Sequence, residues 1–290
     1  MKEKIILLTP VFNDWESLSK LLSKINKIFD EQIKTKFELI IVNDSSKDHY
    51  DFNNYKLKMI EKITVISLNK NVGSQRAIAI GIKYISNLYR DEFKTIIMDS
   101  DGQDNPDAIK KMITESFVNP ECSIVINRGQ RKEPAWFKIF YELYGFLIKI
   151  LCFKKIRFGN FSLLNSNDLK KLSLQNDLWG AFPPTVSKNL NKLIYLTYDR
   201  EKRYGGESKM NFFGLVLHAL KVFSVLKLRI FIFSLVYSII IFLFFQYNYQ
   251  ILSYLIYIFL LFLNLSNLII SFNNEKNYLS NYESISEETI

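Results

Sequence analysis

Charged side chains are absent from one long stretch of this 290-residue chain. No Asp, Glu, Lys, Arg or His stands between Arg229 and Glu275, an interval of about 45 residues. A helix needs roughly 20 apolar residues to cross a bilayer, so the stretch predicts two spans over 230–272 with a turn at Gln246–Gln250. A buried helical hairpin of a soluble protein is the alternative, but such helices normally keep one charged face.

Cysteine and histidine are also scarce, with two of each. Cys122 and Cys152 cannot build a disulfide framework, which excludes a small domain stapled by disulfides. His49 and His218 lie outside every candidate motif. No G-x-G-x-x-G follows the first apolar segment and no Walker sequence occurs, which argues against a dinucleotide-binding or P-loop fold. A hydrophobic content of 48% excludes general disorder.

The net charge of +9 is concentrated in two segments. Residues 127–157 carry eight basic against two acidic side chains, and residues 199–229 carry seven against three. Basic residues beside membrane spans more often meet anionic lipid headgroups than nucleic acid, so we expect a bilayer and no nucleic acid as partner. Lys221, Lys227 and Arg229 precede the first span, which predicts that the N-terminal portion and the tail are cytoplasmic and the turn is outside.

Apolar strands alternate with helices in the first 130 residues. Helices are expected at Leu18–Ile28 and Gln75–Leu88, where apolar residues recur with a helical period. The expected strands are Lys4–Leu8, Phe37–Val42, Ile63–Leu68, Thr95–Met98 and Ser123–Asn127. Nearly continuous apolar strands separated by helices predict an α/β fold with a mostly parallel sheet that is covered on both faces. The first four strands end in small polar or acidic residues, so one crevice is expected along their carboxyl ends.

The chain is expected to divide into four parts. A cytoplasmic globular domain covers 1–209, an amphipathic juxtamembrane helix covers 210–229, two transmembrane helices cover 230–272, and a polar, mobile cytoplasmic tail covers 273–290. A further helix at about 135–153 has apolar residues on more than one face. This pattern is typical of a helix in the membrane interface, and a buried core helix is the alternative.

The segment 94–106 is the most informative motif. A short apolar strand stops abruptly at Asp99 and Asp101, and Gly102 allows the chain to break into a loop there. Such paired carboxylates suit Mg²⁺ or Mn²⁺, which commonly bridge carboxylates to the phosphates of a substrate. The alternative is a polar turn that caps the next helix, with Asp104 as its N-cap and Pro106 in its first turn.

These motifs together resemble family 2 glycosyltransferases of the GT-A fold, over about residues 4–272. More narrowly, the chain resembles the polyprenyl-phosphate branch, which includes dolichol-phosphate mannose synthase. The resemblance rests on Asp99-Ser100-Asp101-Gly102-Gln103-Asp104 and on a loop before the apolar hairpin, with support from Thr9–Asp14, Val42–Ser46 and Asn71–Gly73. That loop reads Arg203-Tyr204-Gly205-Gly206-Glu207-Ser208-Lys209.

The resemblance implies a role for each matching residue. The nucleotide pocket would include Pro10, Phe12 and Asp14, and Asp44 would hydrogen-bond the base, although a turn-forming role for Asp44 stays open. The divalent metal, and through it the donor diphosphate, would be held by Asp99, Asp101 and Gln103. The acceptor phosphate would be collected by the cations and hydroxyl at Arg128, Arg131, Arg203, Ser208 and Lys209. A solvated or headgroup-binding face is the alternative for these cations.

The implied activity is inverting transfer of a sugar from a nucleotide-sugar, with UDP favoured, to a polyprenyl phosphate. The product would serve a cell-envelope polysaccharide. Elongation of a saccharide is one alternative, and a degenerate nucleotide-sugar-binding protein is another. The degenerate alternative arises because Asn160 and Ser162 replace the acid and the arginine of the family's usual G-D-F-R-L motif. Phe12 and Asn43 are milder departures. Self-association of the chain as a homo-oligomer is a further open alternative.

Overall fold

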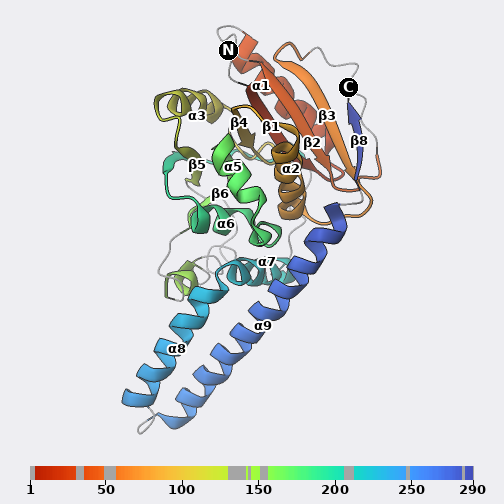
Figure 1. Ribbon diagram of the computed structural model, residues 1–290. Coiled ribbons are helices and arrows are strands. Elements are labelled where there is room, and N and C mark those ends of the chain that lie inside the picture. Colours follow the sequence, from red (N-terminus) through yellow and green to blue (C-terminus); the bar gives the residue numbers. More distant parts are fainter. Residues whose placement is uncertain are drawn as a thin grey trace.

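In the part of the chain that the structure describes, eight strands form one mixed sheet at the centre of the molecule (Figure 1). The computed structural model describes residues 4–30, 36–48, 57–129, 142, 145–150, 156–205, 212–245, 249–282 and 285–289. The strand order is β7-β5-β6-β4-β1-β2-β3-β8. The strands are β1 (Lys4–Val11), β2 (Phe37–Asn43), β3 (Ile60–Leu68), β4 (Phe93–Ile97), β5 (Ser123–Arg128), β6 (Phe158–Asn165), β7 (Leu193–Tyr198) and β8 (Ile285–Thr289).

The predicted parallel core is confirmed. Strand β1 pairs in parallel with β2 and with β4, and β2 pairs in parallel with β3. Strand β6 was not predicted, and it runs antiparallel between β4 and β5. Strand β5 also pairs in parallel with β7. The sheet is therefore mostly parallel, with β6 inserted antiparallel next to β4, the strand that carries the acidic motif, and β8 antiparallel at the β3 edge.

Helices cover both faces of the sheet because successive side chains of a buried strand point to opposite faces. Ile6 and Leu8 of β1 pack in a core with α2 (Ser74–Leu88), α5 (Ser166–Ser173), α6 (Phe182–Asn189) and the 3₁₀ helix η1 (Asn176–Trp179). Ile5 and Leu7 pack in a second core with α1 (Trp15–Asp30) and α3 (Asp107–Val118). Two-sided burial explains why the strands read as continuous apolar runs rather than alternating ones.

Three C-terminal helices form a separate layer below the sheet. Helix α7 (Phe212–Val225) lies across the base of the domain, and α8 (Lys227–Phe244) and α9 (Gln250–Tyr282) project from it as a hairpin (Figure 1). Their common core includes Val222, Phe223, Ile230, Leu260 and Leu263. The layer joins the domain through contacts of α9 with η1 and of α7 with η1 and α6.

The hairpin is a candidate membrane anchor. Lys227–Phe244 and Gln250–Asn274 are both long and apolar enough to cross a bilayer, with mean hydropathies of 2.1 and 2.2. Only 17% of each segment is buried within the molecule. A soluble core hairpin would be mostly covered by protein, so the exposed apolar surface favours lipid as the missing environment.

The end of the chain differs from the expectation of a mobile tail after Phe272. Helix α9 continues to Tyr282, and β8 then pairs antiparallel with the edge strand β3. The polar composition of this segment suggested solvation, but an edge strand needs only one partnered side and accepts polar residues.

Candidate active site

The carboxyl ends of β1, β2 and β4 meet at one edge of the sheet. Leu8 of β1 lies opposite Ile97 of β4, and Val11 lies opposite Asn43 of β2. The loops that follow these strands carry Asp14, Asp44 and Asp99, so the sheet brings the predicted carboxylates to a common edge, as expected.

The acidic loop after β4 is held by its own side chains. Asp104 Oδ2 accepts a hydrogen bond of 3.0 Å from the backbone N–H of Asp99, and Asp101 Oδ1 accepts one of 2.9 Å from the N–H of Gln103. Gly102 has a φ of 79°, a left-handed conformation that favours glycine. The loop therefore turns sharply, which lets acids from successive positions face the same region.

The prediction that Asp104 caps the next helix is wrong. Helix α3 begins at Asp107, with Pro106 at the N-cap position and no side-chain cap. Asn105 Oδ1 accepts the hydrogen bond from the Asp107 N–H at 2.9 Å. Asp104 is 7% exposed and turns instead toward Asp99, so it belongs to the acidic group rather than to the helix end.

Three carboxyl groups are crowded enough to perturb one another. Burial and the neighbouring charge of Asp99 raise the pKa of Asp104 to about 7. The same two causes, burial first, raise the pKa of Asp101. The positive charge of Arg200 lowers the pKa of both carboxyls. The charge of Arg203 also lowers that of Asp101, and the charge of Arg128 also lowers that of Asp104. Like-charged carboxyls gathered in a partly buried site are stabilised by a cation.

Asn160 links Asp99 to the far side of the crevice. Its Nδ2 donates to Asp99 Oδ1 at 2.9 Å, and its Oδ1 accepts from Gln75 Nε2 at 2.8 Å. Gln75 Oε1 in turn accepts the backbone N–H of Phe182 at 2.8 Å. In the sequence, Asn160 stood out only because it replaces the acid of the family's usual motif. In the structure it donates a hydrogen bond to Asp99, a predicted metal ligand.

Asp44 holds the loop that precedes α2. Its two carboxylate oxygens accept hydrogen bonds from the N–H groups of Val72 at 2.7 Å and Gly73 at 2.8 Å. The turn-forming role considered for Asp44 is wrong, because Asn43 Oδ1 makes that turn by accepting the Ser46 N–H at 2.9 Å. Asp44 is thus buried at the edge where the nucleotide is expected, with its position fixed by backbone donors.

The segment 199–205 closes over the acidic loop. Arg203 Nη2 lies 2.8 Å from Asp14 Oδ2, and its Nη1 lies 3.6 Å from Asp101 Oδ2. Two backbone bonds, from Glu201 N–H to the Gln103 carbonyl and from Tyr204 N–H to the Asp101 carbonyl, are both 3.0 Å long. The structure therefore brings Arg203, Asp14 and Asp101 together, three residues predicted from separate motifs.

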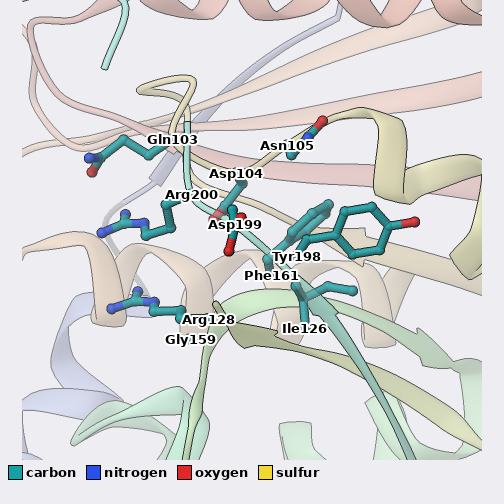
Figure 2. Close-up of a pocket in the computed structure, with 10 residues that line it drawn as sticks. All are labelled: Gln103, Asp104, Asn105, Ile126, Arg128, Gly159, Phe161, Tyr198, Asp199 and Arg200. Carbon is teal, nitrogen blue, oxygen red and sulfur yellow. The ribbon is translucent and has the colours of Figure 1, made fainter. Parts of the chain in front are cut away.

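Two more arginines line a small pocket beside the acids. Figure 2 shows Gln103, Arg128 and Arg200 pointing the same way, with Asp104 behind them. Gly159 gives Arg128 its space, since a Cβ at that position would lie 2.5 Å from Arg128 Nη2. Arg200 was not predicted from the sequence, although it stands three residues before the predicted Arg203.

The remaining predicted residues divide into two groups. Pro10 is buried in β1 opposite Val42, and Phe12 follows that strand with a half-buried side chain. Arg131, Ser208 and Lys209 lie outside the described residues, as does most of the interfacial helix expected at 135–153. Residues 145–150 of that helix are described and are helical, and Ile148 packs with α7 and α8.

The donor set suits a hard divalent cation. Within the described parts of the chain, no group of three or more His, Cys, Asp or Glu side chains has the arrangement of a metal cluster. The chemistry of Asp99, Asp101 and Gln103 nevertheless fits oxygen coordination, and Mg²⁺ usually takes only one or two carboxylates together with substrate phosphates. The raised pKa values of Asp101 and Asp104 indicate a site with unneutralised negative charge.

Comparison with known proteins gives the class of this protein. Residues 6–168 match the family described as Glycosyl transferase family 2, and the chain belongs to that family. The match begins in β1 and ends in α5, so it contains the acidic loop, Asp44 and Asn160.

Two curated relatives carry informative names. The chain is 24% identical over 238 residues to a "Prophage bactoprenol glucosyl transferase homolog" of Escherichia coli, covering 78% of this chain and 74% of that protein. It is 28% identical over 143 residues to an "Undecaprenyl-phosphate 4-deoxy-4-formamido-L-arabinose transferase" of Proteus mirabilis, covering 47% of this chain and 40% of that protein.

A solved structure supports the fold. Glucosyl-3-phosphoglycerate synthase from Mycobacterium tuberculosis, in complex with Mn²⁺ and UDP-glucose, superposes with a TM-score of 0.51 at 12% identity. The match covers 79% of each chain. At this identity the likeness shows the GT-A-like fold alone.

Proposed function

We propose that this glycosyltransferase moves a sugar from a UDP-sugar to a polyprenyl phosphate at the cytoplasmic face of a membrane, with inversion at the anomeric carbon. The observation that carries the proposal is that acidic residues, arginines and a candidate membrane hairpin follow one another in the structure. Acids at the sheet edge lie beside Arg128, Arg200 and Arg203, and the chain after these arginines leads through α7 into a candidate membrane hairpin. Gln75 contacts Asn160 of the acidic site and the adjacent Arg76 contacts Asn274 of α9, so the site for an anionic donor and the lipid-facing layer are neighbours.

On the donor side, Asp44 would meet the base, and Pro10, Phe12 and Asp14 would line the nucleotide pocket. Asp99, Asp101 and Gln103 would hold Mg²⁺ or Mn²⁺, which supplies Lewis-acid stabilisation of the diphosphate leaving group. Asn160 and Asp104 fix the orientation of the Asp99 side chain and backbone. Asn160 therefore fills a supporting role here, which argues against a degenerate protein.

On the acceptor side, arginine forks would bind the lipid phosphate. Arg128 and Arg203 are the described members of the predicted set, and Arg131, Ser208 and Lys209 would complete it. A phosphomonoester is already anionic near neutral pH, so it needs orientation rather than a strong general base. The names of the two curated relatives, one for bactoprenol and one for undecaprenyl phosphate, support this class of acceptor.

One assay tests the proposal. The purified full chain is incubated with Mn²⁺, a panel of UDP- and GDP-sugars, and polyprenyl phosphate, and glycosylated lipid is sought by mass spectrometry. Polyprenol, which lacks the phosphate, is the matched control acceptor. We expect product from polyprenyl phosphate and none from polyprenol. Product only with a saccharide acceptor would overturn the lipid-phosphate assignment. An α-linked product from an α-linked donor would overturn inversion.

A further inference from the structure

A second group of cations lies where the catalytic domain meets the hairpin, apart from the arginines of the acidic site. Arg76 stands in the first turn of α2, and Lys221 stands on α7. The two side chains are close enough that the charge of Arg76 lowers the pKa of Lys221, after the larger effect of burial. Burial also lowers the pKa of Arg76.

Arg76 is partly anchored and partly unsatisfied. Its Nη2 donates to Asn274 Oδ1 of α9 at 3.2 Å, and its guanidinium stacks over the Trp179 ring at 5.3 Å. Its Nε is buried and has no hydrogen-bond partner among the described residues. The guanidinium is thus held in place while one of its donors faces no acceptor.

The described residues offer this pair of cations no carboxylate. Asp177 is the nearby acid, and it is paired with Lys188 at 2.5 Å. Two half-buried like charges repel each other and lose hydration, and both costs are relieved by an anion placed between them. The positive field also reaches His218, whose pKa falls to about 4 through burial and the charges of Lys221 and Arg128.

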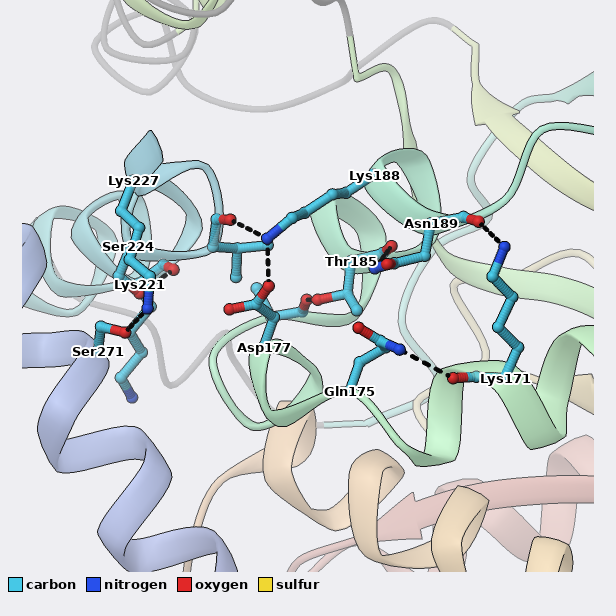
Figure 3. A network of polar contacts seen from close by, with 12 residues as sticks. Lys171, Gln175, Asp177, Thr185, Lys188, Asn189, Lys221, Ser224, Lys227 and Ser271 are labelled. Carbon is cyan, nitrogen blue, oxygen red and sulfur yellow. Dashed lines mark hydrogen bonds and ion pairs between the residues drawn. The ribbon is translucent and has the colours of Figure 1, made fainter. Parts of the chain in front are cut away.

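A cavity of about 130 Å³ reaches Asn274, the hydrogen-bond partner of Arg76. Lys227, Ser224 and Ser271 line it with Asn274, and so does Asp177, whose charge is paired with Lys188. Figure 3 shows Lys221, Lys227 and Ser271 gathered where α7 and α8 meet α9. Hydroxyl, amide and ammonium groups are the donors that phosphate oxygens accept from.

From this geometry we propose that Arg76 and Lys221 bind the phosphate of a membrane lipid at the base of α8 and α9. The site lies at the start of the candidate spans, where lipid headgroups would be found. The phosphate can come from polyprenyl phosphate held here before it reaches Arg128 and Arg203, or from a resident anionic phospholipid. The inference rests on the proposed function only in requiring that the hairpin lies in a membrane.

Binding of lipid to the purified full chain tests the site without any sugar transfer. The chain is placed in neutral phosphatidylcholine nanodiscs and titrated with polyprenyl phosphate, with phosphatidylglycerol, or with polyprenol. Arg76→Gln and Lys221→Gln are compared with wild type. Lys111→Gln, an exposed residue of α3 on the opposite part of the domain, is the matched control. Binding of UDP shows that each variant is folded.

We expect each glutamine variant to weaken binding of a phosphate lipid about tenfold, because one charge-assisted hydrogen bond is lost. Lys221→Arg should restore binding, and polyprenol should bind all proteins equally. Weakening for polyprenyl phosphate identifies the acceptor as the source, and weakening for phosphatidylglycerol alone identifies a resident lipid. Unchanged binding of both phosphate lipids by both variants would overturn the site.

Lipid binding by Arg76 is distinguishable from a purely structural role and from sugar transfer. If Arg76 serves only to join α2 to α9, Arg76→Gln will lower the melting temperature by the same amount with and without phosphate lipid, and the proposal fails. If lipid binding depends on Arg76 and Lys221 but no sugar is ever transferred to lipid, the proposed function fails while this site stands.

Discussion

Asp99 and Asp101 of the acidic loop make different side-chain contacts. Asp101 contacts the Gln103 backbone and Arg203, while Asp99 contacts Asn160 and is fixed by Asp104. An amide at position 101 keeps the shape but removes the charge that would bind a divalent cation. We expect Asp101→Asn to lower sugar transfer at least about 100-fold. Asp107→Asn, at an exposed position on α3, is the control. Near-normal turnover of Asp101→Asn would contradict the metal assignment.

The Asp104 carboxyl gives the protein without metal a characteristic pH dependence. Its pKa is about 7 in the folded chain against 3.8 for an unperturbed aspartate. Between these values the folded state binds more protons than the unfolded state, so stability falls as pH rises from about 4 to about 7. Asp104→Asn should flatten that part of a plot of melting temperature against pH in the presence of a chelator. An unaltered slope would show that Asp104 does not carry this proton.

The contact of Asn160 with Asp99 can be tested through the pKa values of the neighbouring carboxyls and through metal affinity. Asn160→Asp adds a fourth carboxyl beside Asp99, and like charges raise one another's pKa values. We expect the acid limb of the pH–activity profile to move to higher pH, and Asn160→Ala to weaken Mn²⁺ binding about 10- to 100-fold. Sugar transfer measured as a function of pH tests the first expectation, and manganese titration by calorimetry tests the second. A profile and an affinity equal to those of wild type would remove Asn160 from the site.

At the scale of elements, the site depends on two loops that pack together. The Tyr204 ring covers Gly102 so closely that a Cβ at that position would lie 2.2 Å from the ring. Gly102 also needs its φ of 79°. We therefore expect Gly102→Ala to cost about 1–3 kcal/mol of unfolding free energy and to lower activity by displacing Tyr204. Gly145→Ala, where a Cβ meets nothing within 4 Å and alanine is the better helix former, should not lower the melting temperature. Equal melting of the two variants would contradict this packing.

The elements that the sequence predicted are those with a recognisable pattern within their own residues. Strands β1 to β4 are apolar runs that end in polar turns, so both their existence and their convergence could be read directly. Strand β6 lacked such a signal because its pairing partners are distant in sequence. Its residues were interpreted only as the counterpart of the family's G-D-F-R-L motif. Asp104 illustrates the limit at residue scale: an aspartate before a helix suggests a cap, and only the fold shows that it turns back to Asp99.

For the whole molecule, the arrangement of domain and hairpin decides how a soluble donor could meet a lipid acceptor. The acidic site lies at the sheet edge, and the hairpin projects from the base of the same domain (Figure 1). Cations precede that junction along the chain, including Arg128, Arg200, Arg203 and Lys221. This charge distribution favours an anionic membrane face, which in most cells is the cytoplasmic leaflet.

The orientation of the α8–α9 hairpin in the membrane can be tested by chemical labelling. With the domain in the cytoplasm, the turn between α8 and α9 must face outward. Tyr249→Cys is placed at this turn, and Lys111→Cys on α3 is the control, both in a chain carrying Cys122→Ser and Cys152→Ser. A membrane-impermeant maleimide added to intact cells should label Tyr249→Cys and should label Lys111→Cys only after permeabilisation. The positive-inside bias is the reason for this expectation, because Lys227 and Arg229 flank the first span while the turn has no charge. The reverse labelling pattern would place the domain outside, away from cytoplasmic nucleotide-sugars, and would refute the proposed reaction at that membrane face.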